Sequence, residues 1–322
     1  MANAQFLCCG FDGLSVPAEF ARFLREKKPG GVILFSRNYE SPAQLKALCA
    51  ELKSFSDHPP LIMVDQEGGA VVRFKEGFPE MPAARTFGEK RDFAGLSAAC
   101  RRTGTALSQS GVDMNLAPVV DVLAEPKNEY LKPRTFGDEP FLVSQMAQAA
   151  IEALHAGGVL TCAKHFVALG DSAKDPHQLL PQSNTSKEKL EVVFFPPFRA
   201  VVEAGVDCLM STHIRVPALD ETLPMVFSRT ALSLARVVLG FEGPILSDDL
   251  EMGAIADHWG VPEAAVLALA AGNDMALVCH SLERQKAALE KIAKEAEKND
   301  AFARQLAVSR KRLDALRAKR RV

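Results

Sequence analysis

The feature that most constrains this chain is a regular alternation of short apolar runs with longer segments of helical spacing. The apolar runs are rich in β-branched residues and begin near Phe6, Gly31, Leu61, Val112, Val159, Asp207, Pro244 and Asp274. The segments with helical spacing are residues 17–28, 42–56, 94–110, 140–156, 197–204, 228–239 and 261–271. Continuous apolar strands joined through helices are typical of buried parallel sheets, because each crossover between parallel strands needs a helix.

Eight strand–helix units predict an α/β fold, a single (β/α)8 TIM-type barrel, with a doubly wound open sheet as the alternative. The length of 322 residues fits one barrel with a C-terminal helical extension, expected as one helix over about residues 282–317. No linker rich in glycine, serine or proline divides the chain. We therefore expect residues 1–322 to form one domain.

Charge and hydropathy exclude several classes of partner. The 38 basic and 40 acidic residues give a net charge of -2, which provides no positive field for binding nucleic acid. No apolar segment approaches the roughly 18 residues of a membrane span, and the N-terminus lacks the basic stretch and cleavage site of a signal peptide. We expect a cytoplasmic protein that does not contact membranes and is a monomer.

The cysteines and the basic C-terminus are interpreted as structural features. The seven cysteines form no C-x-x-C pair and lie mostly in apolar runs, so we expect core residues in a reducing compartment. Cys162 precedes Lys164 and His165, but packing explains it better than nucleophilic chemistry. The segment RKRLDALRAKRRV is interpreted as complementing a helix dipole before a solvated tail, with contact to an acidic partner as the alternative.

Polar residues follow five successive predicted strands. They are Asp65-Gln66-Glu67, Asn115 with Asp121, Lys164-His165, Ser211-Thr212-His213 and Ser247-Asp248-Asp249. In a (β/α)8 barrel the active site lies at the C-terminal ends of the strands. Helix capping explains any one of these groups, but it does not explain five together. The pattern predicts an active site at this rim.

Two arrangements within the predicted site suggest acid–base and nucleophilic chemistry. Asp248 ends a buried strand, where a carboxylate is usually kept as a nucleophile or a metal ligand. Asp175 precedes His177 by two residues and can orient its imidazole as a general acid; the alternative is a capped turn with a surface histidine.

Metal and nucleotide cofactors are not expected. His165, His177 and His213 with Asp65 or Asp248 form a conceivable ligand set, but the first strand, FLCCGF, lacks the His-x-His pair of barrel metallohydrolases. Neither G-x-G-x-x-G nor a Walker sequence is present.

Several segments of the chain resemble the motifs of a known family. The segments, in order, are GGVILFSRNYESPAQL, LIMVDQEGGAVVRF, MNLAPVVDV, PRTFGDEP, AKHF with the later D-x-H, PFRAVVEAGVDCLMSTHI and SDDLEMGAI. Together they resemble the barrel domain of glycoside hydrolase family 3, and in particular its single-domain bacterial β-N-acetylglucosaminidases of peptidoglycan recycling. The resemblance runs from about Gly31 to Ile255.

The resemblance implies a retaining glycosidase. Asp248 occupies the nucleophile position, and His177 matches the acid/base of this subfamily, with Asp175 as its partner. The positions that hold the hydroxyls and the N-acetyl group of the sugar are Asp65, Arg73, Arg134, Lys164 and His165, and His213 and Met252 are expected to line the same pocket. The implied substrate is a glycoside or muropeptide with terminal N-acetylglucosamine. The alternatives are a phosphorylase of the same fold and a catalytically impaired sugar-binding protein.

This sequence departs from the family pattern in one loop. Family members read Lys-His-Phe-Pro-Gly-His-Gly and then Asp-Ser-His, whereas this chain has Val167-Ala168-Leu169-Gly170 and Asp175-Pro176-His177. Because proline and glycine set where a loop is stiff, we expect the change to alter how this loop moves over the site and which leaving groups it accepts.

Overall fold

The computed structural model describes residues 3–177 and 179–320. In this part of the chain eight parallel strands form a closed barrel, in which β1 pairs with both β2 and β8. The strands are β1 (Leu7–Cys9), β2 (Gly31–Leu34), β3 (Leu61–Val64), β4 (Met114–Asn115), β5 (Leu160–Phe166), β6 (Cys208–Ser211), β7 (Ile245–Asp249) and β8 (Met275–Val278). The predicted (β/α)8 barrel is confirmed, since an open sheet would have two edge strands and this sheet is closed by the pairing of β1 with β8.

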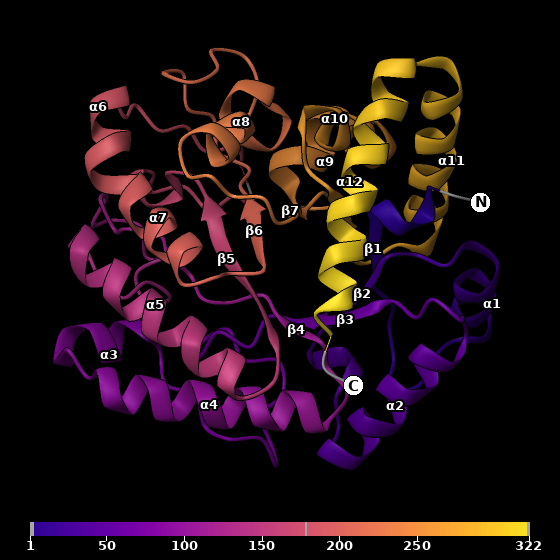
Figure 1. Cartoon of the computed structure of the whole chain (residues 1–322), viewed down its shortest axis with the longest axis horizontal. Coiled ribbons are helices and arrows are strands. Elements are labelled where there is room, and N and C mark those ends of the chain that lie inside the picture. Colours follow the sequence, from indigo (N-terminus) through magenta and orange to yellow (C-terminus); the bar gives the residue numbers. More distant parts are fainter. Residues whose placement is uncertain (1–2, 178, 321–322) are drawn as a thin grey trace.

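The helices surround the barrel, as Figure 1 shows. They are α1 (Ala18–Lys27), α2 (Pro42–Ser54), α3 (Ala84–Lys90), α4 (Phe93–Gln109), α5 (Pro140–Ala156), α6 (Lys187–Lys189), α7 (Phe195–Glu203), α8 (Arg229–Val237), α9 (Gly253–Trp259), α10 (Val261–Ala271), α11 (Leu282–Lys298) and α12 (Asp300–Ala318). Serine side chains cap several of them: Ser41 accepts from the Gln44 N–H of α2, and Ser281 from the Arg284 N–H of α11. No helix among the described residues is both long and apolar enough to cross a bilayer.

The barrel interior and the inner helix faces form one large apolar core. Every residue of β2, β3, β6 and β8 is buried, which explains why these segments read as continuous apolar runs. All seven cysteines are buried and free, as predicted for core residues. Burial raises the pKa of each of these thiols, Cys162 included. A nucleophilic role for Cys162 therefore has no support.

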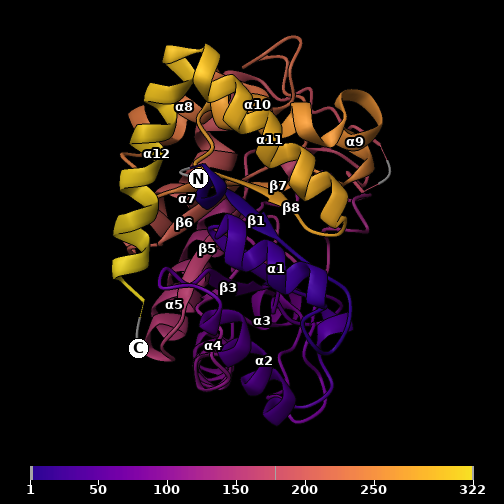
Figure 2. The ribbon, with the colours of Figure 1, turned by 90° about the vertical axis from the view of Figure 1, so that its right-hand side faces the viewer.

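The prediction of a single C-terminal helix over residues 282–317 is wrong. The segment forms two helices, α11 and α12, which meet at Asn299. The backbone of Asn299 leaves the helical region (φ -127°, ψ 97°), and its side chain accepts from the N–H groups of Ala301 and Phe302 at 3.1 Å each. The sequence signal was an Asn-Asp pair, a good helix N-cap, inside a continuous helical pattern. Figure 2 shows the resulting bend between the two helices.

The N-terminal end of the barrel carries three buried aspartates in a repeated arrangement. Asp113, Asp207 and Asp274 directly precede β4, β6 and β8, and each is at most 7% exposed. Each accepts a backbone N–H of the preceding strand, from Ile62 at 2.8 Å, Thr161 at 3.0 Å and Ile245 at 2.8 Å. These side chains tie neighbouring strands together at the end of the barrel opposite the predicted active site.

Three cations of the C-terminal segment, for which a solvated tail was expected, pair with these aspartates instead, and Arg321 and Val322 lie outside the described residues. Arg312 lies 3.2 Å from Asp274, Lys319 lies 3.1 Å from Asp207, and Arg320 lies 3.3 Å from Asp113. The acidic partner of the basic segment is the barrel itself.

Candidate active site

A cavity of about 420 Å³ opens at the C-terminal end of the barrel. Five of the predicted site residues line it: Asp65, Arg73, His177, Asp248 and Met252. Its apolar lining includes Ile33, Leu116, Met210 and Leu277. The volume suits a small polar ligand, with apolar walls and a few converging polar groups. The other predicted site residues are not among its lining residues. Lys164, His213 and Asp175 contact the lining residues Asp65, Asp249 and His177, whereas Arg134 and His165 bond to Glu67 and Asp121.

Asp248 lies at the end of β7 with its two carboxylate oxygens in different environments. Oδ1 accepts the backbone N–H of Asp249 at 2.8 Å, and no hydrogen-bond partner of Oδ2 is found among the described residues. Burial alone would raise the pKa of this carboxyl, but His213, His165, the Asp249 N–H and Lys164 together lower it below its ordinary value. Asp248 is therefore ionised at neutral pH, as a nucleophile requires.

His213 supports the backbone beside Asp248. It is fully buried, and its Nε2 donates to the carbonyl of Asp249 at 2.9 Å. Its Nδ1 is buried without a partner in the described part of the chain. Burial lowers the pKa of His213, so the ring is neutral at pH 7 and Nδ1 is an acceptor. His213 thus helps to fix the strand end that carries Asp248.

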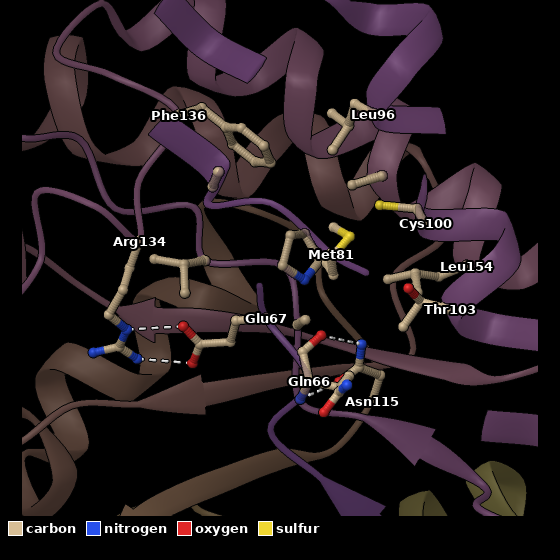
Figure 3. Close-up of a pocket in the computed structure, with 15 residues that line it drawn as sticks. Gln66, Glu67, Met81, Leu96, Cys100, Thr103, Asn115, Arg134, Phe136 and Leu154 are labelled. Atoms are coloured by element: carbon tan, nitrogen blue, oxygen red, sulfur yellow. Dashed lines mark hydrogen bonds and ion pairs between the residues drawn. The ribbon is translucent and has the colours of Figure 1, made fainter. Parts of the chain in front are cut away.

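A buried charge network underlies the cavity on the β3 side. Lys164 Nζ lies 2.6 Å from Asp65 Oδ1 and 2.5 Å from Glu67 Oε1. Arg134 donates two bonds of 2.8 Å to Glu67, while its third nitrogen, Nη1, is turned away and unpartnered in the described structure (Figure 3). Arg73 Nη2 lies 3.5 Å from Asp65 Oδ2. Asp65 is thereby held between two cations at the cavity wall.

Glu67 and Asp121 hold the predicted sugar-binding residues in place, and the sequence assigned them no role. Burial would raise the pKa of Glu67, but Arg134 and Lys164 lower it well below its usual range. Asp121 accepts from His165 twice, from ring Nδ1 at 2.7 Å and from the backbone N–H at 3.1 Å. The sequence indicated these two residues only by their position just after the third and fourth predicted strands. The fold shows that Glu67 contacts Arg134 and that Asp121 contacts His165.

The loop that carries His177 is docked at the start of α9. Asp175 Oδ1 accepts from His177 Nδ1 at 2.7 Å and from its backbone N–H at 2.9 Å, so the turn and the orienting pair occur together. The His177 and Pro176 carbonyls accept from the N–H groups of Gly253 at 3.3 Å and Ala254 at 3.2 Å. The imidazole is 53% exposed and lies edge-on to Tyr130, 5.2 Å between ring centroids. This geometry leaves Nε2 available for proton transfer.

The residues that depart from the family pattern are part of the core. Val167, Ala168 and Leu169 are at most 1% exposed, so the apolar Leu169 side chain packs inside the protein. Ala168 adopts the left-handed conformation (φ 72°), which costs a residue with a Cβ about 1–2 kcal/mol. The segment therefore packs in the core and carries a strained backbone position at the base of the loop.

A second, much smaller cavity lies behind Glu67 and Arg134 (Figure 3). Its volume of about 20 Å³ holds one water molecule and no sugar. Its walls include the buried Thr103, whose Oγ1 is unpartnered in the described structure. Within residues 3–177 and 179–320 no group of three or more His, Cys, Asp or Glu side chains is placed to hold a metal ion.

Comparison with known proteins identifies the family of the chain. Residues 5–313 match the glycosyl hydrolase family 3 N-terminal domain. A β-hexosaminidase of Thiobacillus denitrificans is 38% identical over 284 residues, which cover 84% of this chain and 77% of that protein. A β-hexosaminidase of Tolumonas auensis is 38% identical over 273 residues, covering 84% of this chain and 81% of that protein.

Solved structures agree with the sequence matches. A family 3 β-N-acetylglucosaminidase from Paenibacillus superposes with a TM-score of 0.95 and 34% identity over 98% of this chain, which spans 61% of that protein. NagZ from Neisseria gonorrhoeae, in complex with N-trifluoroacetyl-D-glucosamine, has a TM-score of 0.81 and 28% identity, with 94% of this chain and 96% of that one covered. The fold, the ionised carboxylate at the barrel rim and these matches identify a glycoside hydrolase, and the chain belongs to glycosyl hydrolase family 3.

Proposed function

We propose that the protein is a retaining exo-β-N-acetylglucosaminidase that releases terminal β-linked N-acetylglucosamine from peptidoglycan fragments or related glycosides. The observation that carries the proposal is the cavity shared by Asp248, whose Oδ2 is unpartnered among the described residues, and His177, whose Nδ1 is held by Asp175. A nucleophile and a proton donor facing one sugar-sized cavity are the minimum that retaining hydrolysis requires. The names of the relatives, β-hexosaminidase and β-N-acetylglucosaminidase, support the choice of sugar.

In the first step Asp248 Oδ2 attacks the anomeric carbon while the bond to the leaving oxygen breaks. His177 Nε2 donates its proton to that oxygen, so the leaving group departs as a neutral alcohol. Asp175 stabilises the imidazolium before transfer and fixes the tautomer through Nδ1. The product is a covalent glycosyl-enzyme.

In the second step His177, now neutral, accepts a proton from water as the water attacks the anomeric carbon. The bond to Asp248 breaks, and the sugar leaves with its original configuration. The Lys164 charge and the Asp249 N–H, which help to lower the pKa of Asp248, also make it a good leaving group here, since they stabilise the carboxylate.

Asp65 and Arg73 are proposed to bind the sugar hydroxyls at the cavity wall. The Lys164–Asp65 contact of 2.6 Å holds one oxygen of the carboxylate, and the other lies toward Arg73. Arg134, Lys164 and His165 act from below: they are at most 6% exposed and bonded to Glu67, Asp65 and Asp121. Such preformed partners reduce the cost of desolvating each hydroxyl.

The test compares hydrolysis of an aryl N-acetyl-β-glucosaminide by the wild type, Asp248→Ala and His177→Ala. We expect Asp248→Ala to lose nearly all turnover, and His177→Ala to lose less because an activated aryl leaving group needs little protonation. A slow 5-fluoro analogue of the sugar should add its mass to the peptide that contains Asp248. Equal turnover by the wild type and Asp248→Ala would refute the nucleophile assignment.

The same assay separates the two alternative functions. A phosphorylase would give mainly a sugar 1-phosphate when phosphate is present, whereas the hydrolase gives the free sugar with or without phosphate. A sugar-binding protein would bind N-acetylglucosamine but would not turn over the aryl glycoside, with or without phosphate.

A further inference from the structure

A half-exposed aromatic side chain, His280, stands at the lip of the active-site cavity and has no part in the chemistry described so far. It follows β8 and lines the cavity together with Phe35 from the end of β2. Its imidazole stacks on the Phe35 ring with centroids 5.4 Å apart and planes inclined by 30°. The side chain is 51% exposed, so one part of the ring is covered and the rest faces solvent at the cavity opening.

The stack is fixed from several sides. His280 Nε2 lies 3.1 Å from Asp249 Oδ2, and the His280 backbone N–H donates to Glu251 Oε2 at 2.5 Å. The Arg37 guanidinium lies 4.3 Å from the Phe35 centroid and donates to the Cys279 carbonyl at 2.8 Å. An exposed aromatic group held this firmly has lost its rotamer freedom before any ligand arrives, which favours binding.

The short segment 251–253 links His280 to the proton donor. The Glu251 side chain holds the backbone of His280, and the Gly253 N–H holds the carbonyl of His177. The Cα atoms of Glu251 and Gly253 are at most about 7 Å apart, because two residues cannot reach further. In the proposed reaction the leaving oxygen lies at His177, and His177 and His280 line the same cavity of about 420 Å³, so the group attached to that oxygen occupies the space that His280 borders.

We propose that the His280 ring, backed by Phe35, is the platform for the second sugar of the substrate, the ring that bears the leaving oxygen. The inference rests on the proposed function and adds a specificity determinant to it. Pyranose rings present apolar C–H faces that pack on aromatic rings, while their equatorial hydroxyls stay in water, as a half-exposed platform requires. The substrate class is therefore a β-linked N-acetylglucosaminide whose leaving group is itself a sugar.

The test uses two substrates whose leaving groups are both alcohols and differ in the second ring. They are N,N′-diacetylchitobiose and methyl N-acetyl-β-glucosaminide, assayed with His280→Ala and His280→Phe. The matched control is His258→Ala, which removes an exposed histidine packed on Trp259 outside the cavity lining. Rates are expressed per active site, titrated with the 5-fluoro analogue, so that misfolded protein does not count.

We expect His280→Ala to lower kcat/KM for the disaccharide about five- to tenfold, mainly through KM, and to change the methyl glycoside less than about twofold. His280→Phe keeps the ring and should stay within about twofold of the wild type on both substrates, as should His258→Ala. Equal losses on both substrates, no loss on either, or a His280→Phe variant as weak as His280→Ala would overturn the platform. A wild type that hydrolyses the aryl glycoside but not the disaccharide would also overturn the platform, whereas a wild type inactive on the aryl glycoside would overturn the proposed function.

Discussion

The paired cations at the C-terminus give a prediction about stability that compares two adjacent residues. Arg320→Ala and Lys319→Ala each remove one cation from a buried aspartate at the N-terminal end of the barrel. The Arg320 side chain is 15% exposed and that of Lys319 is 55% exposed. If these ion pairs stabilise the fold, the two substitutions should lower the free energy of unfolding by different amounts, because one pair is largely buried and the other is exposed.

The magnitude follows from what each side chain contacts. Arg320 Nη2 donates to the carbonyls of Pro59 at 3.2 Å and Pro60 at 2.9 Å, and bonds of a charged group contribute about 1.5–3 kcal/mol. Asp113 keeps Lys53 at 2.7 Å after the substitution, so no buried charge is stranded and the loss should be about 2–3 kcal/mol. The exposed Lys319 pair should contribute less than about 1 kcal/mol.

The assay is urea unfolding of the full chain, followed by circular dichroism, with activity on the aryl glycoside as a control. We expect the free energy of unfolding to fall in the order wild type, Lys319→Ala, Arg320→Ala, with kcat/KM unchanged because both residues lie at the opposite end of the barrel. A Lys319→Ala variant as unstable as Arg320→Ala, or no effect of either, would show that the contacts do not stabilise the fold.

Four further predictions concern buried charge, its pH dependence, backbone strain and the thiols. Glu67→Gln leaves Arg134 and Lys164 with one carboxylate fewer and should cost about 3–5 kcal/mol of unfolding free energy in urea; a loss below about 1 kcal/mol would contradict the network. Because the pKa of Glu67 lies below its ordinary 4.5, its contribution is complete above about pH 4.5 and is lost as the pH falls, so wild-type stability should decline more steeply there than that of the variant. Ala168→Gly should raise stability by roughly 0.5–1 kcal/mol, since glycine removes the left-handed penalty but costs chain entropy; destabilisation would argue against the strain. All seven cysteines should resist Ellman's reagent in the native protein and react in urea, and rapid native labelling of any one would contradict its burial.

The fold could be predicted because its signal is local and repeated. Each buried parallel strand must be continuously apolar, so the eight runs could be counted without knowing their contacts. The break at Asn299 was missed because the apolar spacing continues across it, and the capping signal is one short side chain. The ion pairs at the N-terminal end of the barrel were missed for a different reason. Arg320 and Asp113 are far apart in sequence, and their pairing depends on the closed fold.

The site was predictable only in part, because some of its residues act through partners that are distant in the sequence. Asp65, Arg73, His177, Asp248 and Met252 line one cavity because strand ends of one barrel converge. Glu67 and Asp121 follow the same strands, but their roles depend on facing Arg134 and His165. His280 lacked a signal altogether, because a histidine after a strand indicates nothing until Phe35 is found beneath it.

The aspartates at the two ends of the barrel show what separates a structural carboxylate from a reactive one. Asp274 is fully buried, yet Arg236 at 2.8 Å, Arg312 at 3.2 Å and the Ile245 N–H satisfy it completely. Asp248 has one backbone N–H on Oδ1 and no hydrogen-bond partner on Oδ2 among the described residues, and its charge is stabilised by neighbours that do not bond that oxygen. Both carboxylates adjoin a buried strand, Asp274 directly before β8 and Asp248 near the end of β7. An oxygen that is ionised but unbonded is free to attack carbon, and a saturated one is not, so the hydrogen-bond pattern supports the proposal that Asp248, and not Asp274, is the nucleophile.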